Sequence, residues 1–382
     1  MAKLGDICTV VSGSTPKTGV AEYWDGTVKW ITPAELNEDS FYITDSVRHI
    51  TEDGKEKTGL SYLPKGTVIL SSRAPIGKTA IAGCEMCCNQ GFKNLICSDA
   101  VYNEYLYFFL KSKTNYLNSL GRGATFKEIS KSIVEKIEIP LPNIEKQHQI
   151  VKELKATRNL IAHRKQQLTK LDELIKARFV EVFGDMLLNS LEWPEKSLES
   201  LADIVSGITK GRKTTETELI EVPYMAVSNV KSGYIDWTTV KTILATKQEI
   251  EQYRLMPDDI LMTEGGDPDK VGRGAIIKNP LKDSIHQNHI FRVRLDKSEL
   301  LPAYFAEYLQ HQKAKRYFLG CAKQTTGIAS INMRQLRALP VLIPPLPLQN
   351  QFAAFVAEVD KSKLFAELFA QNACILAENR SK

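Results

Sequence analysis

Several residue patterns in this chain could carry out chemistry, and each lacks a part that the chemistry requires. Residues 76–79 read Ile-Gly-Lys-Thr, which is how a phosphate-binding P-loop ends. A complete P-loop has a glycine five residues before Gly77, and this chain has Ser72 there. The run after Lys78 is typical of a strand, not of the helix whose N-terminus binds phosphate. The sequence therefore does not predict a nucleotide site.

Acidic and histidine residues are likewise incomplete as catalytic or metal sites. A nuclease carboxylate cluster requires an acid two residues before its lysine, and Pro268 stands there before Lys270. The sequence has neither the Asp/Asn-Pro-Pro-aromatic motif of amino-methyltransferases nor a Gly-x-Gly-x-x-Gly after a strand. His286 and His289 are three residues apart on an expected strand, so they should face opposite sides. We expect structural or hydrogen-bonding roles for both, and no assembled active site.

The cysteines leave a metal site as an alternative. Seven cysteines, an odd number, favour reduced thiols in a cytosol. Cys84 and Cys87 have the spacing of zinc ligands, and Cys88 and Cys97 follow, but no second close pair comes at the distance of a zinc ribbon. Because the flanking runs resemble strands, we favour buried thiols over zinc.

What remains is a set of polar, basic and glycine-containing loops that recur in both halves of the chain. In the first half they are residues 14–17, 71–78, 89–93 and 121–125, and in the second 209–213, 263–274, 286–289 and 323–328. Arg, Lys, Asn, Gln, Ser and Thr are the residues that reach phosphates and base edges. Each loop alone is typical of a solvated surface, but their recurrence favours nucleic-acid contact.

The loops recur because the chain repeats itself in order. Leu-Gly-Asp-Ile at 4–7 returns as Leu-Ala-Asp-Ile at 201–204, and Ser-Gly at 12–13 returns at 206–207. Residues 139–142, followed by Gln147, return as residues 344–347, followed by Gln351. The period of roughly 190 to 205 residues is too long for a solenoid, whose repeats span about 20 to 50. It is about the length of one domain and one long helix.

Each copy begins with a mixed α+β texture. In the first copy, residues 28–31, 67–70, 79–82, 93–97 and 137–139 are typical of strands. Residues 103–120 and 125–134 have helical character. The order is not a regular βαβ alternation, so we predict an α+β domain.

A long helix should follow each domain. From about residue 144 to 188 the chain has no proline, and its first glycine is Gly184. A helix of about 40 residues is about 60 Å long, and with one apolar stripe it needs a partner. Residues 348 to about 378 supply a second stripe. The pattern predicts an antiparallel two-helix coiled coil, and the alternative is two separate helices, each packed on its own domain.

The fold prediction is therefore α+β, with two similar mixed α+β domains separated by a long antiparallel two-helix coiled coil. We place the domains at 1–143 and 189–346, and the helices at 144–188 and 347–382.

The length of 382 residues accommodates two cores, and the net charge of +5 permits nucleic-acid binding without requiring it. Neither a transmembrane run nor a signal peptide is present, so we expect a cytoplasmic protein.

The motifs resemble a known family. Residues 71–77, 89–93 and 123–129, with 263–267, 272–276 and 286–289, are similar to the target-recognition domains of type I restriction–modification specificity subunits. Residues 142–151 and 345–351 resemble the beginnings of that family's two conserved helical regions. Departures from the pattern are a short second helix and the lack, near Gln351, of an acid like Glu145.

The resemblance implies a non-catalytic subunit of a larger enzyme, with each domain reading one half of a split double-stranded DNA target and the helices setting the gap. Two modification subunits, which carry S-adenosylmethionine, would dock on the helices, and restriction subunits with ATP- and Mg-dependent translocase activity would join. No cofactor is expected in this chain. The residues expected to contact DNA are Lys17, Ser72, Arg73, Lys78, Asn89, Gln90, Lys93, Arg122, Thr125, Lys210, Arg212, Lys213, Glu264, Lys270, Arg273, Gln287, Asn288, Gln324 and Thr325.

Two interpretations from other classes of protein compete with that of a DNA-specificity subunit. A self-contained nuclease or methyltransferase would need a further domain of about 150 residues, and no segment is left over for it. A protein-binding scaffold with tandem α+β domains and no DNA role remains the alternative.

Overall fold

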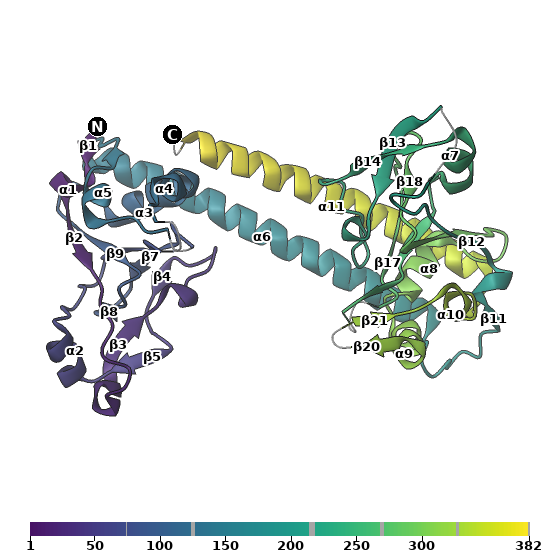
Figure 1. Cartoon of the computed structure of the whole chain (residues 1–382), viewed down its shortest axis with the longest axis horizontal. Coiled ribbons are helices and arrows are strands. Elements are labelled where there is room, and N and C mark those ends of the chain that lie inside the picture. The colour runs from purple at the N-terminus through teal and green to yellow at the C-terminus, as the bar shows by residue number, and fades with distance from the viewer. Residues whose placement is uncertain (74, 124–126, 214–217, 268–270, 326–327, 381–382) are drawn as a thin grey trace. The chain divides into compact units, whose positions relative to one another are not determined.

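The computed structural model describes residues 1–382 apart from 74, 124–126, 214–217, 268–270, 326–327 and 381–382, and apart from the side chains of 324, 325, 328 and 370–380 (Figure 1). Its internal contacts divide the chain into two compact units. Unit 1 holds residues 1–165 with 367–382, and unit 2 holds residues 166–366.

Unit 1 is built on a five-stranded sheet in the order β2-β9-β6-β7-β4. Its strands β6 (Val68–Leu70) and β7 (Thr79–Ala82) are buried at every position, which explains their short apolar runs. A smaller sheet, β5-β3-β8, contains a parallel pair in which Trp30 lies opposite Cys87. Further strands are β1 (Ala2–Lys3), β2 (Cys8–Ser12), β3 (Trp24–Ile31), β4 (Tyr42–Ile43), β5 (Arg48–Ile50), β8 (Cys87–Cys88), β9 (Lys93–Cys97) and β10 (Glu138–Ile139).

The helices of unit 1 correct two predicted boundaries. The helix predicted over 103–120 is two helices, because the hydroxyl of Thr114 donates to Lys111 O at 2.9 Å and Lys113 leaves the helical conformation. The helix predicted over 125–134 begins only after Ser130, whose side chain caps Ile133 N at 3.3 Å. The helices are α1 (Leu4–Ile7), α2 (Glu52–Thr58), α3 (Asn103–Ser112), α4 (Thr114–Leu120) and α5 (Lys131–Glu135).

Unit 2 contains a four-stranded sheet, β12-β19-β15-β17, and a smaller sheet, β14-β13-β18. The smaller sheet again has a parallel pair, with Tyr224 opposite Ile285. A further small sheet, β16-β21-β20, lies beside α9 (Figure 1). The strands are β11 (Glu195–Ser197), β12 (Ala202–Ser206), β13 (Ile220–Met225), β14 (Lys241–Ala245), β15 (Ile260–Thr263), β16 (Gly265–Gly266), β17 (Gly274–Ile276), β18 (Ile285–His286), β19 (Ile290–Leu295), β20 (Lys323–Thr325), β21 (Ile328–Ser330) and β22 (Pro340–Leu342).

The helices of unit 2 pack its core. Tyr304, Phe305 and Phe318 are fully or almost fully buried in one cluster with the strands of the four-stranded sheet. Thr246 and Glu249 form a capping box that begins the helix after β14. The helices are α7 (Lys247–Tyr253), α8 (Pro302–Tyr308), α9 (Gln312–Cys321) and α10 (Met333–Arg337).

The backbone of each unit repeats that of the other. Leu4 donates its N–H to Ile137 O at 2.9 Å, and Leu198 donates to Leu339 O at 3.0 Å. The counterpart of Leu4 is therefore Leu198, and the sequence echo that matched Leu4 with Leu201 is out of register by three residues. The residue Leu198 precedes strand β12 as Leu4 precedes β2, and this geometry decides the alignment.

Two long helices are present. Helix α6 (Ile144–Phe183) ends five residues before the predicted end at 188, because Gly184 turns into the left-handed region with φ +75°. Helix α11 spans Leu346–Arg380. Each helix contributes residues to both units.

Within unit 2 the two long helices pack antiparallel (Figure 1). Phe183 near the end of α6 contacts Phe352 near the start of α11, with ring centroids 5.5 Å apart. Earlier in α6, Asp172 pairs at 2.6 Å with Lys363, which comes later in α11. The partner number falls as the α6 number rises, so the helices run in opposite directions, and the predicted antiparallel pairing is confirmed.

Candidate nucleic-acid interface

In unit 1 the recurring loops meet at Ser72, just after β6. Ser72 donates its N–H to Gly91 O at 2.7 Å and accepts the N–H of Ile129 at 2.9 Å. The side chain of Ser72 is fully buried. These bonds join the segments after β6, before β9 and before α5, so one small region collects three of the predicted contact loops.

Unit 2 makes the same junction with different side chains. Glu264 donates its N–H to His289 O at 3.0 Å and accepts the N–H of Ile331 at 2.8 Å. Glu264 therefore takes the place of Ser72, and His289 takes the place of Gly91.

Close backbone contact fixes a neighbouring loop in both units. A Cβ atom on Gly13 would come within 1.9 Å of Asn89 O, and one on Gly207 within 2.0 Å of His286 O. Both glycines immediately follow the first strand of the larger sheet. A side chain at either position would displace the loop that carries the predicted Asn and Gln contacts.

Unit 1 carries a charged cluster at its junction, the Glu128 cluster, which consists of Arg73, Lys93 and Glu128. The carboxylate of Glu128 pairs with Arg73 Nε at 2.9 Å and with Lys93 Nζ at 3.2 Å. Burial opposes the charge, but the hydrogen bonds from Arg73 and Lys93 outweigh it and lower the pKa of Glu128. The Arg73 side chain is 47% exposed and the Lys93 side chain 10%. Arg73 is thus the most exposed member of the cluster.

Unit 2 has uncharged residues at the positions of the Glu128 cluster. Gly265 pairs with Ser330 between β16 and β21, as the arginine and the glutamate pair in unit 1. Phe291 takes the place of Lys93 in the register of β19 against β12. The charges of unit 1 are therefore absent from the equivalent described positions of unit 2.

Unit 2 instead carries charge where unit 1 has none. His289 Nδ1 lies 2.6 Å from the Glu264 carboxylate, and we call these residues the Glu264–His289 pair. The side chains are 34% and 57% exposed, respectively. The equivalent positions in unit 1 hold the buried Ser72 and the side-chain-free Gly91. The same backbone junction thus presents different chemistry in the two units.

Three other residues of unit 1 that were predicted to contact DNA have exposed side chains. Lys17, Gln90 and Arg122 are exposed, and the hydroxyl of Thr15 is hydrogen-bonded to Gln90. These three side chains are available to a ligand.

Two predicted contacts of unit 1 are used inside the protein. Asn89 Oδ1 accepts the N–H of Gly91 at 2.9 Å, which shapes the loop before β9. Lys78 Nζ donates to Pro33 O at 3.1 Å, and strand β7 follows Lys78 directly, in agreement with the predicted strand there.

In unit 2, Lys210 and Lys213 are exposed. Arg212 between them is held by the Glu249 carboxylate, and it also donates to Leu244 O at 3.2 Å. The hydrogen bond to Glu249 raises the pKa of Arg212. Its guanidinium therefore fastens the loop to α7.

The remaining contacts predicted in unit 2 are partly enclosed. Arg273 is half-buried, and its Nε has no hydrogen-bond partner among the described residues. Gln287 accepts the N–H of Val227 at 3.4 Å, and Asn288 is half-buried beside it. Thr125 and Lys270, and the side chains of Gln324 and Thr325, lie outside the described residues.

The sequence prediction missed Glu128 and His289. Glu128 lies within the motif at 123–129, but an isolated glutamate gives no signal of its distant arginine partner. A structural or hydrogen-bonding role was expected for His289, and its ring does form a hydrogen bond to Glu264, but the sequence did not place this exposed ring among the DNA contacts. His286, by contrast, is fully buried, as a structural role requires.

Of the four cysteines that were predicted to be buried thiols, Cys87 and Cys88 are buried, whereas Cys84 and Cys97 are half-buried. Cys87 and Cys88 lie in the core, and burial raises their pKa values to about 11 and about 12, respectively. Cys84 Sγ donates to Thr44 O at 3.2 Å. The described residues contain no group of three or more side chains that could hold a metal ion.

A buried glutamine anchors α6 to unit 1. Gln147 is fully buried, and its Nε2 donates to Ala100 O at 3.0 Å and to Pro142 O at 2.9 Å. Its Oε1 accepts the N–H of Tyr102 at 2.8 Å.

Gln349 anchors α11 to unit 2 in the same way. It donates to Glu299 O at 3.0 Å and to Pro344 O at 2.8 Å, and it accepts the N–H of Leu301 at 2.8 Å. The sequence comparison matched Gln147 with Gln351, which is exposed, so that match is wrong by two residues.

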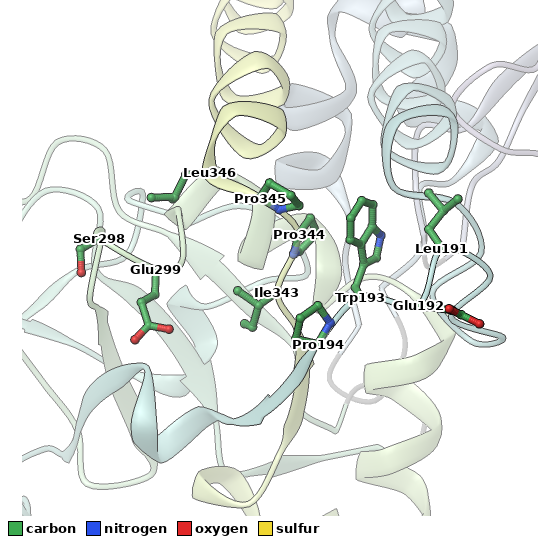
Figure 2. A pocket seen from close by; sticks show the side chains of 10 residues that line it. All are labelled: Leu191, Glu192, Trp193, Pro194, Ser298, Glu299, Ile343, Pro344, Pro345 and Leu346. Carbon is green, nitrogen blue, oxygen red and sulfur yellow. The ribbon is translucent and has the colours of Figure 1, made fainter.

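A hollow of about 470 Å³ lies beside this second anchor (Figure 2). Figure 2 shows Ile343, Pro344 and Pro345 between Glu299 on one side and Trp193 on the other. Trp193 is fixed there because its Nε1 donates to Phe183 O at 2.9 Å. The hollow belongs to the base of α11 and contains none of the predicted DNA contacts.

Comparison with known proteins identifies the class. The family model described as the type I restriction modification DNA specificity domain matches residues 1–173 and 190–368, so the chain belongs to this family. The role of such a protein is DNA recognition. In the part of the chain that the structure describes, no helix has the length and apolar character needed to cross a membrane.

Named relatives agree with the family. The specificity subunit of the type I restriction enzyme MjaIX from Methanocaldococcus jannaschii is 32% identical over 374 residues, covering 93% of this chain and 85% of the relative. The EcoKI specificity subunit of Escherichia coli K12 is 23% identical over 380 residues, covering 94% and 81%. A solved structure described as the basis of complex assembly and conformational transition of the type I restriction–modification system has the same fold, with TM-score 0.61, 17% identity, and coverage of 100% of this chain and 95% of that chain.

Proposed function

We propose that the two units read the two halves of a bipartite double-stranded DNA target with a fixed gap. The observation that carries this proposal is the shared backbone junction, which presents the Glu128 cluster in unit 1 and the Glu264–His289 pair in unit 2. A common scaffold with different side chains suits two half-sites of different sequence, because base identity is read by side chains in the grooves.

This chain would contribute recognition and no catalysis. S-adenosylmethionine would be held by two modification subunits, and ATP and Mg by restriction subunits that join the complex. This division of labour fits a sequence without an assembled catalytic motif. The relatives from Methanocaldococcus jannaschii and Escherichia coli K12 are both named as specificity subunits, which supports the same assignment.

The long helices would bind the modification subunits. In unit 2, Leu174 and Val180 of α6 are both 47% exposed, and Leu364 and Phe365 of α11 are 57% and 65% exposed. Large apolar side chains exposed in such numbers on a helix pair are typical of an interaction surface. We therefore place the docking surface on this part of α6 and α11.

Genome-wide mapping of methylated adenines tests the proposal. The full chain would be expressed with its cognate modification subunits in a host without other adenine methylation. A split motif with one constant gap is the expected result. Methylation that lacks a split motif, or that is independent of this chain, would exclude the assignment. Efficient copurification without any sequence-specific methylation would favour the protein-binding scaffold.

A further inference from the structure

Only the side chains of the Glu264–His289 pair are available to a ligand. The backbone N–H and C=O of Glu264 are both used in the junction, by His289 O at 3.0 Å and by the N–H of Ile331 at 2.8 Å. The two residues that follow Glu264 are Gly265 and Gly266, which have no side chains to cover it. The carboxylate and the imidazole are therefore the chemical groups that a ligand at this junction would meet.

Folding does not require this pair. A hydrogen-bonded contact between side chains that are 34% and 57% exposed contributes little to stability, because water competes for both groups. In unit 1 the same backbone junction forms with Ser72 and Gly91, which make no such pair. The pair is thus an addition to a scaffold that is complete without it.

The carboxylate of Glu264 argues against a phosphate contact. A carboxylate at a DNA interface is repelled by the phosphate backbone, so it would weaken binding unless it meets a base. Glutamate accepts a hydrogen bond from the exocyclic N4 amino group of cytosine in the major groove. Imidazole at 2.6 Å restricts the carboxylate rotamer, which fixes the direction in which the free oxygen points.

We propose that Glu264 reads the cytosine of one C·G base pair in the half-site recognised by unit 2, and that His289 positions its carboxylate. This inference rests on the proposed function. In unit 1 the equivalent position is the buried Ser72, so the half-site of unit 1 is read without this contact. Glu264 is then a residue that distinguishes the two halves of the target.

Methylation mapping of the full chain with its modification subunits tests the inference. Glu264→Gln replaces an acceptor-only carboxylate with an amide that also donates, and glutamine pairs with adenine N6 and N7. The expected result is a motif in which one C·G position of the second half-site also accepts A·T. The first half-site and the gap should stay as in the wild type. Discrimination at that position should fall about tenfold.

Binding measurements separate reading from folding. With Glu264→Gln, affinity for non-cognate duplex should stay equal or rise, since a negative charge near phosphates is removed. His289→Ala should loosen the same single position, because its effect acts through Glu264. A variant that merely disturbs the fold would lower affinity for every sequence and blur several positions.

Asp258→Asn is the matched control. Asp258 is an acid in the same unit whose side chain is 43% exposed and pairs with Lys297 at 2.6 Å, so the substitution removes another paired carboxylate away from the junction. Its motif should be unchanged. A wild-type motif without a C·G pair in its second half, or an unchanged motif in Glu264→Gln, would overturn the inference while leaving the proposed function intact. Absence of a split motif in the wild type would overturn both.

Discussion

Gln147 and Gln349 occupy the same place in the two copies and make the same three hydrogen bonds. Each lies three residues after the first residue of its long helix, and each is fully buried. Each donates from Nε2 to two backbone carbonyls at 2.8–3.0 Å and accepts one backbone N–H at 2.8 Å. A planar amide with all these contacts fixes how each helix leaves the unit that it begins in.

Replacing either anchor should destabilise the unit that contains it. Gln349→Ala leaves two carbonyls and one N–H without partners in the interior, and we expect unit 2 to lose about 2–4 kcal/mol in the free energy of unfolding. Urea unfolding monitored by tryptophan fluorescence measures the change. Gln351→Ala is the control, because that side chain is exposed and should change stability by less than about 0.5 kcal/mol. Equal effects at both positions would contradict the anchor role.

The anchors show why local sequence could not align the two copies. Gln349 and Gln351 have similar neighbours in the sequence. Gln349 is the anchor because it binds the carbonyl of Glu299, which is 50 residues away in the chain. For Gln147 the corresponding carbonyl is 47 residues away. The α+β class and the long helices could be predicted from apolar spacing, because those patterns are local.

The candidate site was predictable only as a set of loops. Recurrence located the segments that meet at Ser72 and at Glu264. It could not show that Arg73 meets Glu128, 55 residues away, or that Glu264 meets His289, 25 residues away. Pairing between loops follows from strand register, which one sequence does not display.

The helix pair offers a second prediction. Phe352 is fully buried between Phe179 and Phe183, with centroid distances of 5.4 and 5.5 Å. Phe352→Ala removes this packing and should lower the stability of unit 2 by about 3–5 kcal/mol. Thermal or urea unfolding of the purified chain measures it.

Phe365 is the matched comparison on the same helix. Its side chain is 65% exposed, so Phe365→Ala should leave the stability of the chain nearly unchanged. If the exposed apolar residues form the proposed docking surface, this variant should weaken binding of the modification subunits several-fold in a titration. Wild-type affinity for those subunits would remove Phe365 from the surface.

His286 should make the stability of unit 2 sensitive to acid. Burial lowers its pKa from 6.5 to about 4, and the nearby Arg292 adds to the effect against a weak hydrogen bond to Val205 O. The folded state thus holds the ring neutral, whereas the unfolded chain takes up a proton below about pH 6.5. The neutral His286 ring therefore contributes about 3 kcal/mol to the free energy of unfolding of unit 2. This contribution is fully present above that pH and is lost as the pH falls toward 4.

The substitution His286→Gln isolates that contribution. The stability difference between wild type and variant should grow by about 3 kcal/mol between pH 4 and pH 7, because only the wild type has this titrating ring. Denaturant unfolding at a series of pH values gives the difference. A difference that stays constant with pH would show that the ring is not protected from protonation in the folded state.

Arg73 provides a test of the junction in unit 1. Its guanidinium is 47% exposed and held at 2.9 Å from Glu128, so it is oriented yet accessible. The substitution Arg73→Ala removes a cation and leaves the Glu128 carboxylate less neutralised. Both effects disfavour binding of a polyanion. Binding of cognate duplex by the assembled complex should weaken, and the slope of log affinity against log salt should fall by about one if Arg73 contacts a phosphate. Lys297→Ala removes a paired cation whose side chain is 56% exposed and which is far from the loops in sequence, and this change should leave affinity and slope unchanged. A loss confined to one base position, with the slope preserved, would instead make Arg73 a base contact.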